Sequence, residues 1–458
     1  MPIIWDKVPA DAWVAKYYNN IFLGLIIFYV SIRLYFFHSY PMIIPEGDAQ
    51  AYLLLSREYG LWSAPLLLGE RPPGYPIFLK LFSGNFNAIY SVQFIISVVS
   101  VISILCAASR VLKSYILKMI LFVVLIPFFL NADLLIWDKW IITEALSLST
   151  FLIILSFLLY WGEKPTVLNL SLLAVLWVYW GALRDGNIPM LFFLILYIFA
   201  GAIVGLTERR YLWLCIVLIP FIIYSNYAIE KNKRYWINLA NVISLRILND
   251  EEGVSYFQKK GMPLNDEVLK RRGRQVGDNY ESFFKNEELT KFRTWAINYG
   301  KDTYLRYLVT HPEILLMRPF RDSSSDSIKI HRSVRDLSIR EVFEKRLDEG
   351  YQLEQTPLIF RRVEGDILNI YIVGGAYLFA IVYLIRNLLK KGKENDQRIN
   401  WILFFIISSY PFMLILWHSD AWDVWRHLLP AMVQFKLGIV LLGLFLLDGM
   451  IAGRILKK

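Results

Sequence analysis

Residues 40–82 read YPMIIPEGDAQAYLLLSREYGLWSAPLLLGERPPGYPIFLKLF and separate the first two apolar segments of the chain. Within them, PEG at 45–47 leads into Asp48, which begins a half-polar segment that we expect to be helical as far as about Gly60. The proline- and glycine-rich run ERPPGYP at 70–76 should then turn the chain back toward the apolar part. A loop with this mixture of acidic, basic and aromatic side chains is expected at a membrane surface.

The composition of the whole chain is that of a membrane protein. Of its 458 residues, 56% are hydrophobic and 19% are charged, whereas about a quarter are charged in soluble domains. The net charge of +10 does not indicate a nucleic-acid partner, because basic residues that flank apolar segments explain most of the excess positive charge. Cys106 and Cys215 both lie in apolar segments, so we expect neither a disulfide framework nor a thiolate metal site.

Apolar runs of the length that crosses a bilayer predict an all-α, multi-pass fold of about ten spans. The predicted spans are 20–38, 87–107, 115–131, 140–161, 167–182, 188–206, 211–229, 366–386, 399–417 and 428–450. We therefore predict an N-terminal membrane module of about seven spans (1–230, with the loop 39–86), a polar insert (231–364) and a C-terminal module of about three spans (365–458).

The distribution of basic residues predicts the orientation of these spans. If the N-terminus is cytoplasmic, the inner connections and their edges carry most of the basic residues near the spans: Arg110, Lys113, Lys118, Lys164, Arg209, Arg210, Arg386, Lys390, Lys391, Lys393, Arg398, Arg454, Lys457 and Lys458. The loop 39–86 and the insert 231–364 are then extracytoplasmic. The first residues lack the apolar core and cleavage site of a signal peptide, so none is expected to be removed.

The insert carries the signals of a small α-rich domain. Helical patterns at 251–260 and 287–299 each end at a glycine, and Ser338-Ile339-Arg340-Glu341 is a capping box before a third helix. The serine-rich run at 323–327 is typical of a loop.

In this orientation the unusual polar side chains all fall on the outer face, so that one site can contain them. Asp48 could be the N-cap of the helix that follows it, or a general base that takes a proton from an acceptor hydroxyl. Arg71 could be a solvated turn residue or a ligand for an anionic group. Arg33, near the outer end of the first span, is explained by snorkelling.

Glu144 lies about one turn into the fourth predicted span, where a carboxylate needs a partner or a water-filled cavity. It could form a structural ion pair with Lys139 or Arg184, or act as a second catalytic carboxylate. Arg184 and Asp185 lie in a short outer turn, where they could simply cap helix ends. A guanidinium at this position also suits the phosphate of a lipid headgroup.

The run HSDAWDVWRH at 418–427 is the densest polar cluster outside the insert. Its histidines and aspartates could suggest a metal, but their spacing fits no standard site. Asp420 and Trp422 are explained by an interfacial loop with an aromatic belt. Arg426 and His427 are better candidates, because they could hold a phosphate.

Three motifs resemble those of a known superfamily: the GDAQAY start at 47–52, the RPPGYPIFL run at 71–79, and Arg-His before a late proline at 426–430. They are similar to motifs of the GT-C fold glycosyltransferases that use polyprenyl-phosphate sugars, such as the protein mannosyltransferases and the bacterial lipid A aminoarabinose transferases. The sequence departs from that pattern at the first acidic site, where a glycine separates Glu46 from Asp48. A divalent metal therefore stays an open question, and no other cofactor is indicated.

The resemblance implies a GT-C-like bundle and an inverting enzyme of the bacterial cytoplasmic membrane with its active site facing outside. It would move one sugar from a polyprenyl-phosphate carrier to a glycan, lipid or protein acceptor, with membrane lipid as a further partner. The implied catalytic carboxylates are Asp48 and Glu144. The implied substrate-binding side chains are Arg71, Tyr75, Arg184, Arg426 and His427.

Two other functions remain open at the level of sequence. A surface polysaccharide polymerase or ligase that uses polyprenyl-pyrophosphate-linked glycans would share the outer arginines and the large outer segment. A flippase or transporter of lipid-linked sugars should instead have binding residues near the bilayer midplane and repeated spans.

Overall fold

The computed structural model describes residues 9–39, 42, 47–162, 165–276, 280–320, 370–389, 396–422 and 424–451. Every regular element in these ranges is a helix. Seven of the described helices are long and apolar enough to cross a membrane. The predicted all-α, multi-pass membrane fold is therefore confirmed.

Each of the predicted spans coincides with a helix, and the differences are confined to the helix ends. Three of these apolar helices, α6, α9 and α10, have fewer than 18 residues, and α10 reaches spanning length only together with the short turn η2 (Asp185–Asn187) before it. The bundle consists of α1 (Pro9–Ser39), α5 (Phe86–Val111), α6 (Tyr115–Phe129), α8 (Thr143–Trp161), α9 (Val167–Leu183), α10 (Ile188–Val204), α11 (Leu212–Lys231), α21 (Ile370–Leu389), α22 (Gln397–Ser419) and α23 (Val424–Ile451).

The bundle is held together by close packing of large side chains against small ones. Trp177, Trp180 and Trp401 are almost completely buried in its core. On α23, a Cβ added to Gly438 would lie 2.7 Å from Cγ1 of Ile406 on α22. Glycine at this contact lets the two helices approach, as is common between helices in membranes, where small residues bring backbones together.

The loop after α1 contains three short helices, α2 (Asp48–Glu58), α3 (Ala64–Leu68) and α4 (Gly74–Lys80). The expected helix from Asp48 is thus confirmed, although it ends before Gly60. Its apolar side chains form a small core of their own with α5, α8 and α9, in which Tyr52, Tyr75 and Leu79 are buried. This core fixes the loop on the end of the bundle.

The described part of the insert is a second group of helices: α12 (Trp236–Val242), η4 (Ile243–Ile247), α13 (Glu251–Lys259), α14 (Asp266–Leu269), α15 (Tyr280–Lys285), η6 (Glu287–Leu289), α16 (Thr290–Trp295), η7 (Ala296–Gly300), α17 (Lys301–Thr310), α18 (Pro312–Leu316) and η8 (Arg318–Phe320). They surround a separate apolar core that includes the fully buried Phe257 and Tyr307.

Two sequence predictions for the insert can be compared with these helices. The helix from Glu251 ends before Gly261, as expected. The predicted stop at Gly300 is wrong, because the chain continues into α17. A Cβ at Gly300 would lie 2.8 Å from a methyl group of Leu239, so this glycine permits close packing rather than ending a helix. The predicted capping box at 338–341, the serine run at 323–327 and the boundary at 364 lie outside the described residues.

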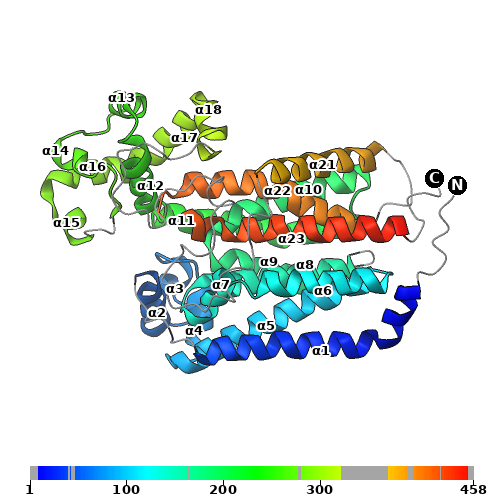
Figure 1. Cartoon of the computed structure of the whole chain (residues 1–458). Helices are drawn as coiled ribbons and strands as arrows, with labels where there is room; N and C mark the ends of the chain where they lie inside the picture. Colours follow the sequence, from blue (N-terminus) through cyan, green and yellow to red (C-terminus); the bar gives the residue numbers. More distant parts are fainter. Residues whose placement is uncertain are drawn as a thin grey trace.

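The two polar parts lie at one end of the bundle. Helices α2, α3 and α4 and the insert helices α12 to α18 gather at the same end, and the two chain termini are marked at the other (Figure 1). A single site can therefore draw residues from the loop, the insert and the ends of several spans.

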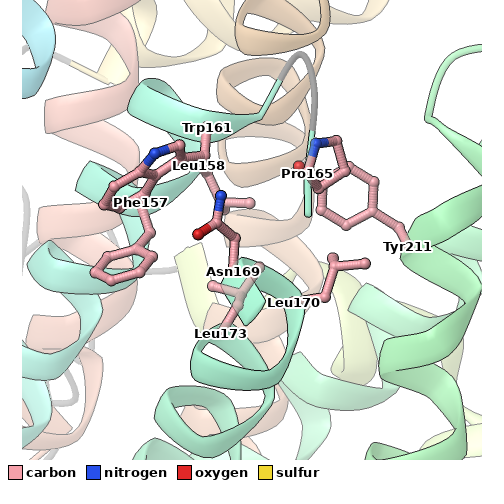
Figure 2. Close-up of a pocket in the computed structure, with 8 residues that line it drawn as sticks. All are labelled: Phe157, Leu158, Trp161, Pro165, Asn169, Leu170, Leu173 and Tyr211. Atoms are coloured by element: carbon pink, nitrogen blue, oxygen red, sulfur yellow. The ribbon is translucent and has the colours of Figure 1, made fainter. Parts of the chain in front are cut away.

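A small pocket lies at the turn between α8 and α9, away from that end. Trp161, Asn169 and Tyr211 are among the side chains around it (Figure 2). The Tyr211 hydroxyl donates a hydrogen bond to the Gly162 carbonyl oxygen, 3.1 Å away. This contact ties the turn to the start of α11, and the pocket is too small and apolar to hold a charged substrate.

Candidate functional site

Asp48 is the central acidic residue of the site, and it is not a helix cap. The cap position of α2 is Gly47, whose φ of 53° lies in the region that favours glycine, and no side chain caps this helix end. The Asp48 carboxylate instead accepts hydrogen bonds from Arg71 at 2.7 Å and from Arg426 at 3.0 Å. The N-cap alternative is therefore wrong, and the carboxylate is engaged by two cations.

Arg71 is held in place by the turn that follows it. A Cβ added to Gly74, the first residue of α4, would lie 2.8 Å from the carbonyl oxygen of Ala182. Only glycine lets the start of α4 pack this closely on the end of α9. The Arg71 guanidinium also lies 5.6 Å from the centre of the Tyr52 ring, one helical turn beyond Asp48. The RPPG sequence thus presents the cation to the carboxylate.

Glu144 lies in the first turn of α8 with a 3% exposed side chain. Its carboxylate is 3.2 Å from Arg184 and 3.6 Å from Nε of Arg426, and it also accepts a hydrogen bond from the Thr143 hydroxyl. Of the two partners considered from sequence, Arg184 is the one observed, because Lys139 donates to a backbone carbonyl instead. A buried carboxylate is tolerated here because two guanidinium groups face it.

These contacts join Arg71, Arg184, Arg426, Asp48 and Glu144 in one network, which we call the arginine cluster. Its members come from the loop turn and from the ends of α2, α8, α9 and α23. Arg426 bridges the two carboxylates. Three guanidinium groups face two carboxylates, so the cluster has a surplus of positive charge at the end of the bundle, which suits an anionic ligand.

His427 extends the cluster toward the insert. Its Nδ1 lies 3.2 Å from Arg184, and its Nε2 lies 3.4 Å from a carboxylate oxygen of Asp420. The other oxygen of Asp420 accepts from Asn241 of α12. Sequence reasoning explained Asp420 as a loop residue and did not select Asn241. The position of Asp420 seven residues before His427, across a tight turn, is the signal that could have identified it.

Asp185, beside Arg184, belongs to a neighbouring contact. Its carboxylate accepts a hydrogen bond from Arg234 at 3.0 Å, and Arg234 also donates to the carbonyl oxygen of Gly69 at 2.7 Å. This pair ties the beginning of the insert to the loop. Its cation, Arg234, is not one of the arginines that pair with Asp48 or Glu144.

Tyr75 does not lie among the charged side chains. It is completely buried, its hydroxyl donates to Gln93 at 2.5 Å, and its ring packs edge-on against Tyr52. The structure thus places Tyr75 in the core beneath the loop, and its substrate-binding role stays a prediction.

Arg33 is not a snorkelling residue, and that explanation is wrong. Its side chain is 2% exposed and is paired with the buried carboxylate of Asp138. It also donates to the Tyr29 hydroxyl and to Ser97. The pair fastens α1 to the short helix η1 (Ile136–Lys139), which precedes Glu144 in sequence. Its partner could not be recognised from the sequence around Arg33 alone.

The two arginines determine the protonation of Asp48. Burial by itself would raise its pKa, but Arg426 and Arg71 hold the pKa of this carboxyl well below its usual range. The ion pairs therefore stabilise the folded state fully above the unfolded-state pKa of about 3.9. This stabilisation is lost as the pH falls through the lower pKa of the folded state. Asp48 is therefore ionised at neutral pH and, while it keeps both arginines, is a weak base.

The described residues contain no cluster of three side chains of the kind that binds metal ions. Within the described ranges, no three His, Cys, Asp or Glu side chains gather closely enough to hold a metal ion. Asp48 and Glu144 are both bonded to guanidinium groups, which compete with a cation. His418 bonds to the Tyr304 hydroxyl and the Leu315 carbonyl oxygen instead of joining His427. Glu46 and Asp423 lie outside the described residues.

Comparisons with known proteins identify no family. No protein-family model matches the sequence, and no curated protein matches it. Two solved structures are similar over 98% and 97% of this chain: the Archaeoglobus fulgidus oligosaccharyltransferase in its apo form (11% identity, TM-score 0.45) and the oligosaccharyltransferase AglB of the same archaeon in complex with an inhibitory peptide and a dolichol-phosphate (10% identity, TM-score 0.42). The chain spans about half the length of each, 52%.

Proposed function

We propose that this protein is an integral membrane glycosyltransferase that transfers one sugar from a polyprenyl monophosphate to an acceptor at the extracytoplasmic face. The observation that carries the proposal is Asp48 held between Arg71 and Arg426, 2.7 and 3.0 Å away. The residues involved belong to the motifs that resemble the polyprenyl-phosphate-sugar transferases. Arg184 and His427 complete a positive surface beside them.

The proposed reaction uses both kinds of charge. An acceptor hydroxyl attacks the anomeric carbon of the sugar, the bond from that carbon to the phosphate oxygen breaks, and the configuration inverts. Asp48 takes the hydroxyl proton, and the phosphate leaves with the bonding electrons on its oxygen. Preorganised guanidinium groups stabilise this developing charge, and positioned proton transfer contributes about 10² to 10⁴ in rate.

Because Asp48 is paired with Arg71 and Arg426, binding of the donor phosphate should also change the basicity of Asp48. A phosphate that enters the cluster competes with Asp48 for the donors of Arg71 and Arg426. Because these arginines hold the pKa of Asp48 low, each one that turns to phosphate lets this pKa rise toward its ordinary value. Asp48 therefore becomes a stronger base when the leaving group is in place.

Glu144, which the sequence resemblance implied as a second catalytic carboxylate, has a positioning role in the proposed reaction. Its buried carboxylate contacts Arg184 and Arg426, and both arginines also belong to the proposed phosphate site. We propose that Glu144 positions these two cations, rather than acting on the sugar itself.

A panel of lipid-linked donors tests the proposed function. Purified protein, supplied with polyprenyl-monophosphate sugars and a membrane extract as the source of acceptor, should transfer sugar and release polyprenyl monophosphate in equal amounts. Transfer only from pyrophosphate-linked glycans would favour the polymerase or ligase instead. Movement of the lipid-linked sugar across the membrane of vesicles, without chemical transfer, would favour the flippase. A flippase is expected to bind its substrate near the bilayer midplane, whereas the arginine cluster lies at one end of the bundle.

The proposed orientation has its own test by cysteine labelling. In a background with Cys106→Ser and Cys215→Ser, Lys291→Cys in the insert should react with an impermeant maleimide on intact cells, because this position is exposed. Lys16→Cys, exposed near the start of α1, is the matched control and should react only after permeabilisation. The reverse pattern would place the cluster on the cytoplasmic side and exclude an extracytoplasmic acceptor.

A further inference from the structure

The insert is joined to the arginine cluster at the end of α22. Arg246 of η4 donates a hydrogen bond to the carbonyl oxygen of Trp417 at 2.5 Å, and its guanidinium stacks 3.4 Å from the centre of the Trp417 ring. Tyr304 of α17 bonds to His418 at 2.8 Å. These contacts bring the insert to the turn between α22 and α23, where Asp420 lies.

Asp420 is buried and fully engaged at this junction. One of its oxygens accepts from the side chain of Asn241 and from the backbone N–H of Trp422, and the other faces His427. Asn241 is itself fixed, because its side-chain oxygen accepts from the backbone N–H of Val276 at 2.9 Å. The carboxylate is thus oriented by the insert on one side and faces the imidazole on the other.

These contacts determine which nitrogen of His427 carries the proton. An arginine side chain has only donors, so Nδ1 of His427 must accept from Arg184, 3.2 Å away. The ring proton is then on Nε2, which lies 3.4 Å from Asp420. An ionised carboxylate can only accept hydrogen bonds, so Asp420 favours the tautomer with the proton on Nε2 and disfavours the one with the proton on Nδ1.

We propose that Asp420 is a positioning residue that fixes the tautomer of His427 and, through it, the orientation of Arg184 in the phosphate site. The chain of contacts runs from Asn241 in the insert through Asp420 and His427 to Arg184, whose other terminal nitrogen pairs with Glu144. Docking of the insert is therefore a condition for a preorganised anion site. The phosphate part of this inference rests on the proposed function, whereas the tautomer part does not.

Asp420→Asn is the decisive variant, because asparagine has the same shape but can turn a donor toward His427. Nε2 would then accept, the ring proton would move to Nδ1, and Nδ1 would meet the donors of Arg184. Nitrogen NMR of histidine-labelled protein in detergent, with the His427 signals assigned through His427→Gln, should show an unprotonated Nδ1 in the wild type and a protonated Nδ1 in the variant. An unchanged tautomer would overturn the proposal.

The second measurement is the affinity for polyprenyl monophosphate without a sugar. Asp420→Asn should weaken it about tenfold, since one charge-assisted contact of Arg184 is disturbed. Asp250→Asn is the matched control: this carboxylate pairs with Arg318 at 3.2 Å inside the insert and should leave the affinity unchanged. A switched tautomer with wild-type affinity would sink the link to Arg184.

Two further outcomes keep the test decisive. If Asp420→Asn does not fold, Asp420→Glu keeps an acceptor and should retain the wild-type tautomer; a protonated Nδ1 in that variant would contradict the proposal. If the wild type itself does not bind polyprenyl monophosphate, the proposed function and the affinity argument both fail, while the tautomer measurement still decides what Asp420 does.

Discussion

Asp48→Asn should lower the rate of sugar transfer by at least about 100-fold, the effect expected when a general base is removed. The folded state should survive, because Gly47 rather than Asp48 is the cap of α2 and the asparagine oxygen can still accept from Arg71. The measurement is turnover with one polyprenyl-monophosphate sugar, together with the melting temperature of the purified protein. A wild-type rate at a wild-type melting temperature would remove Asp48 from the chemistry.

Asp185→Asn provides a matched control for this experiment. Asp185 has the same exposed fraction as Asp48, 31%, lies at the same end of the bundle and is also paired with an arginine. Its partner, Arg234, is outside the arginine cluster. Asp48→Asn loses the pairs with Arg71 and Arg426, and Asp185→Asn loses the pair with Arg234. A rate that falls equally in both variants would show a structural effect, whereas a loss confined to Asp48→Asn would identify the base.

Arg426→Gln should have the second large effect, because this side chain contacts both carboxylates of the cluster. We expect transfer to fall by about 100-fold or more, from loss of a cation that stabilises the leaving phosphate. Stability should fall by about 2 kcal/mol, as Glu144 keeps only Arg184 as its cationic partner. Arg426→Lys should recover little, because one ammonium lacks the forked geometry that reaches two carboxylates.

Stability and activity can be separated at this position. Glu144→Gln in the Arg426→Gln background removes the buried charge that lost one of its two cationic partners, so the melting temperature should partly recover while transfer stays low. Arg234→Gln is the control, since it removes another well-buried arginine at the same end and should reduce the melting temperature without weakening phosphate binding. Full activity in Arg426→Gln would show that the leaving phosphate does not depend on this cation.

The fold was largely predictable because apolar length is a strong signal. Each predicted span coincides with a helix, and the alternating direction of successive spans correctly gathered Asp48, Glu144, Arg184 and Arg426 at one end. The predicted helix from Asp48 was found as well. These features depend on local composition and on the length of each apolar run, which the thickness of a bilayer sets and which is visible in the sequence.

The partners of individual charges were not predictable in the same way. Arg426 and Asp48 are 378 positions apart, and nothing near either one specifies the other. Arg33 was explained by snorkelling because its partner, Asp138, is reached only when α1 packs beside η1. Asp420 was taken for a loop residue because its hydrogen bond to Asn241 forms only when the insert packs on the end of α22. Tertiary packing, rather than local pattern, determines all three contacts.

The most direct test of the account is the affinity for polyprenyl monophosphate in the wild type and in Asp48→Asn. If phosphate and Asp48 share Arg71 and Arg426, removal of the competing carboxylate charge should tighten phosphate binding, by about tenfold, in the same variant that loses turnover. The dissociation constants can be measured in detergent with sugar-free lipid, so that no acceptor is needed. Equal or weaker binding in Asp48→Asn would contradict the claim that the donor phosphate displaces Asp48 from its arginines.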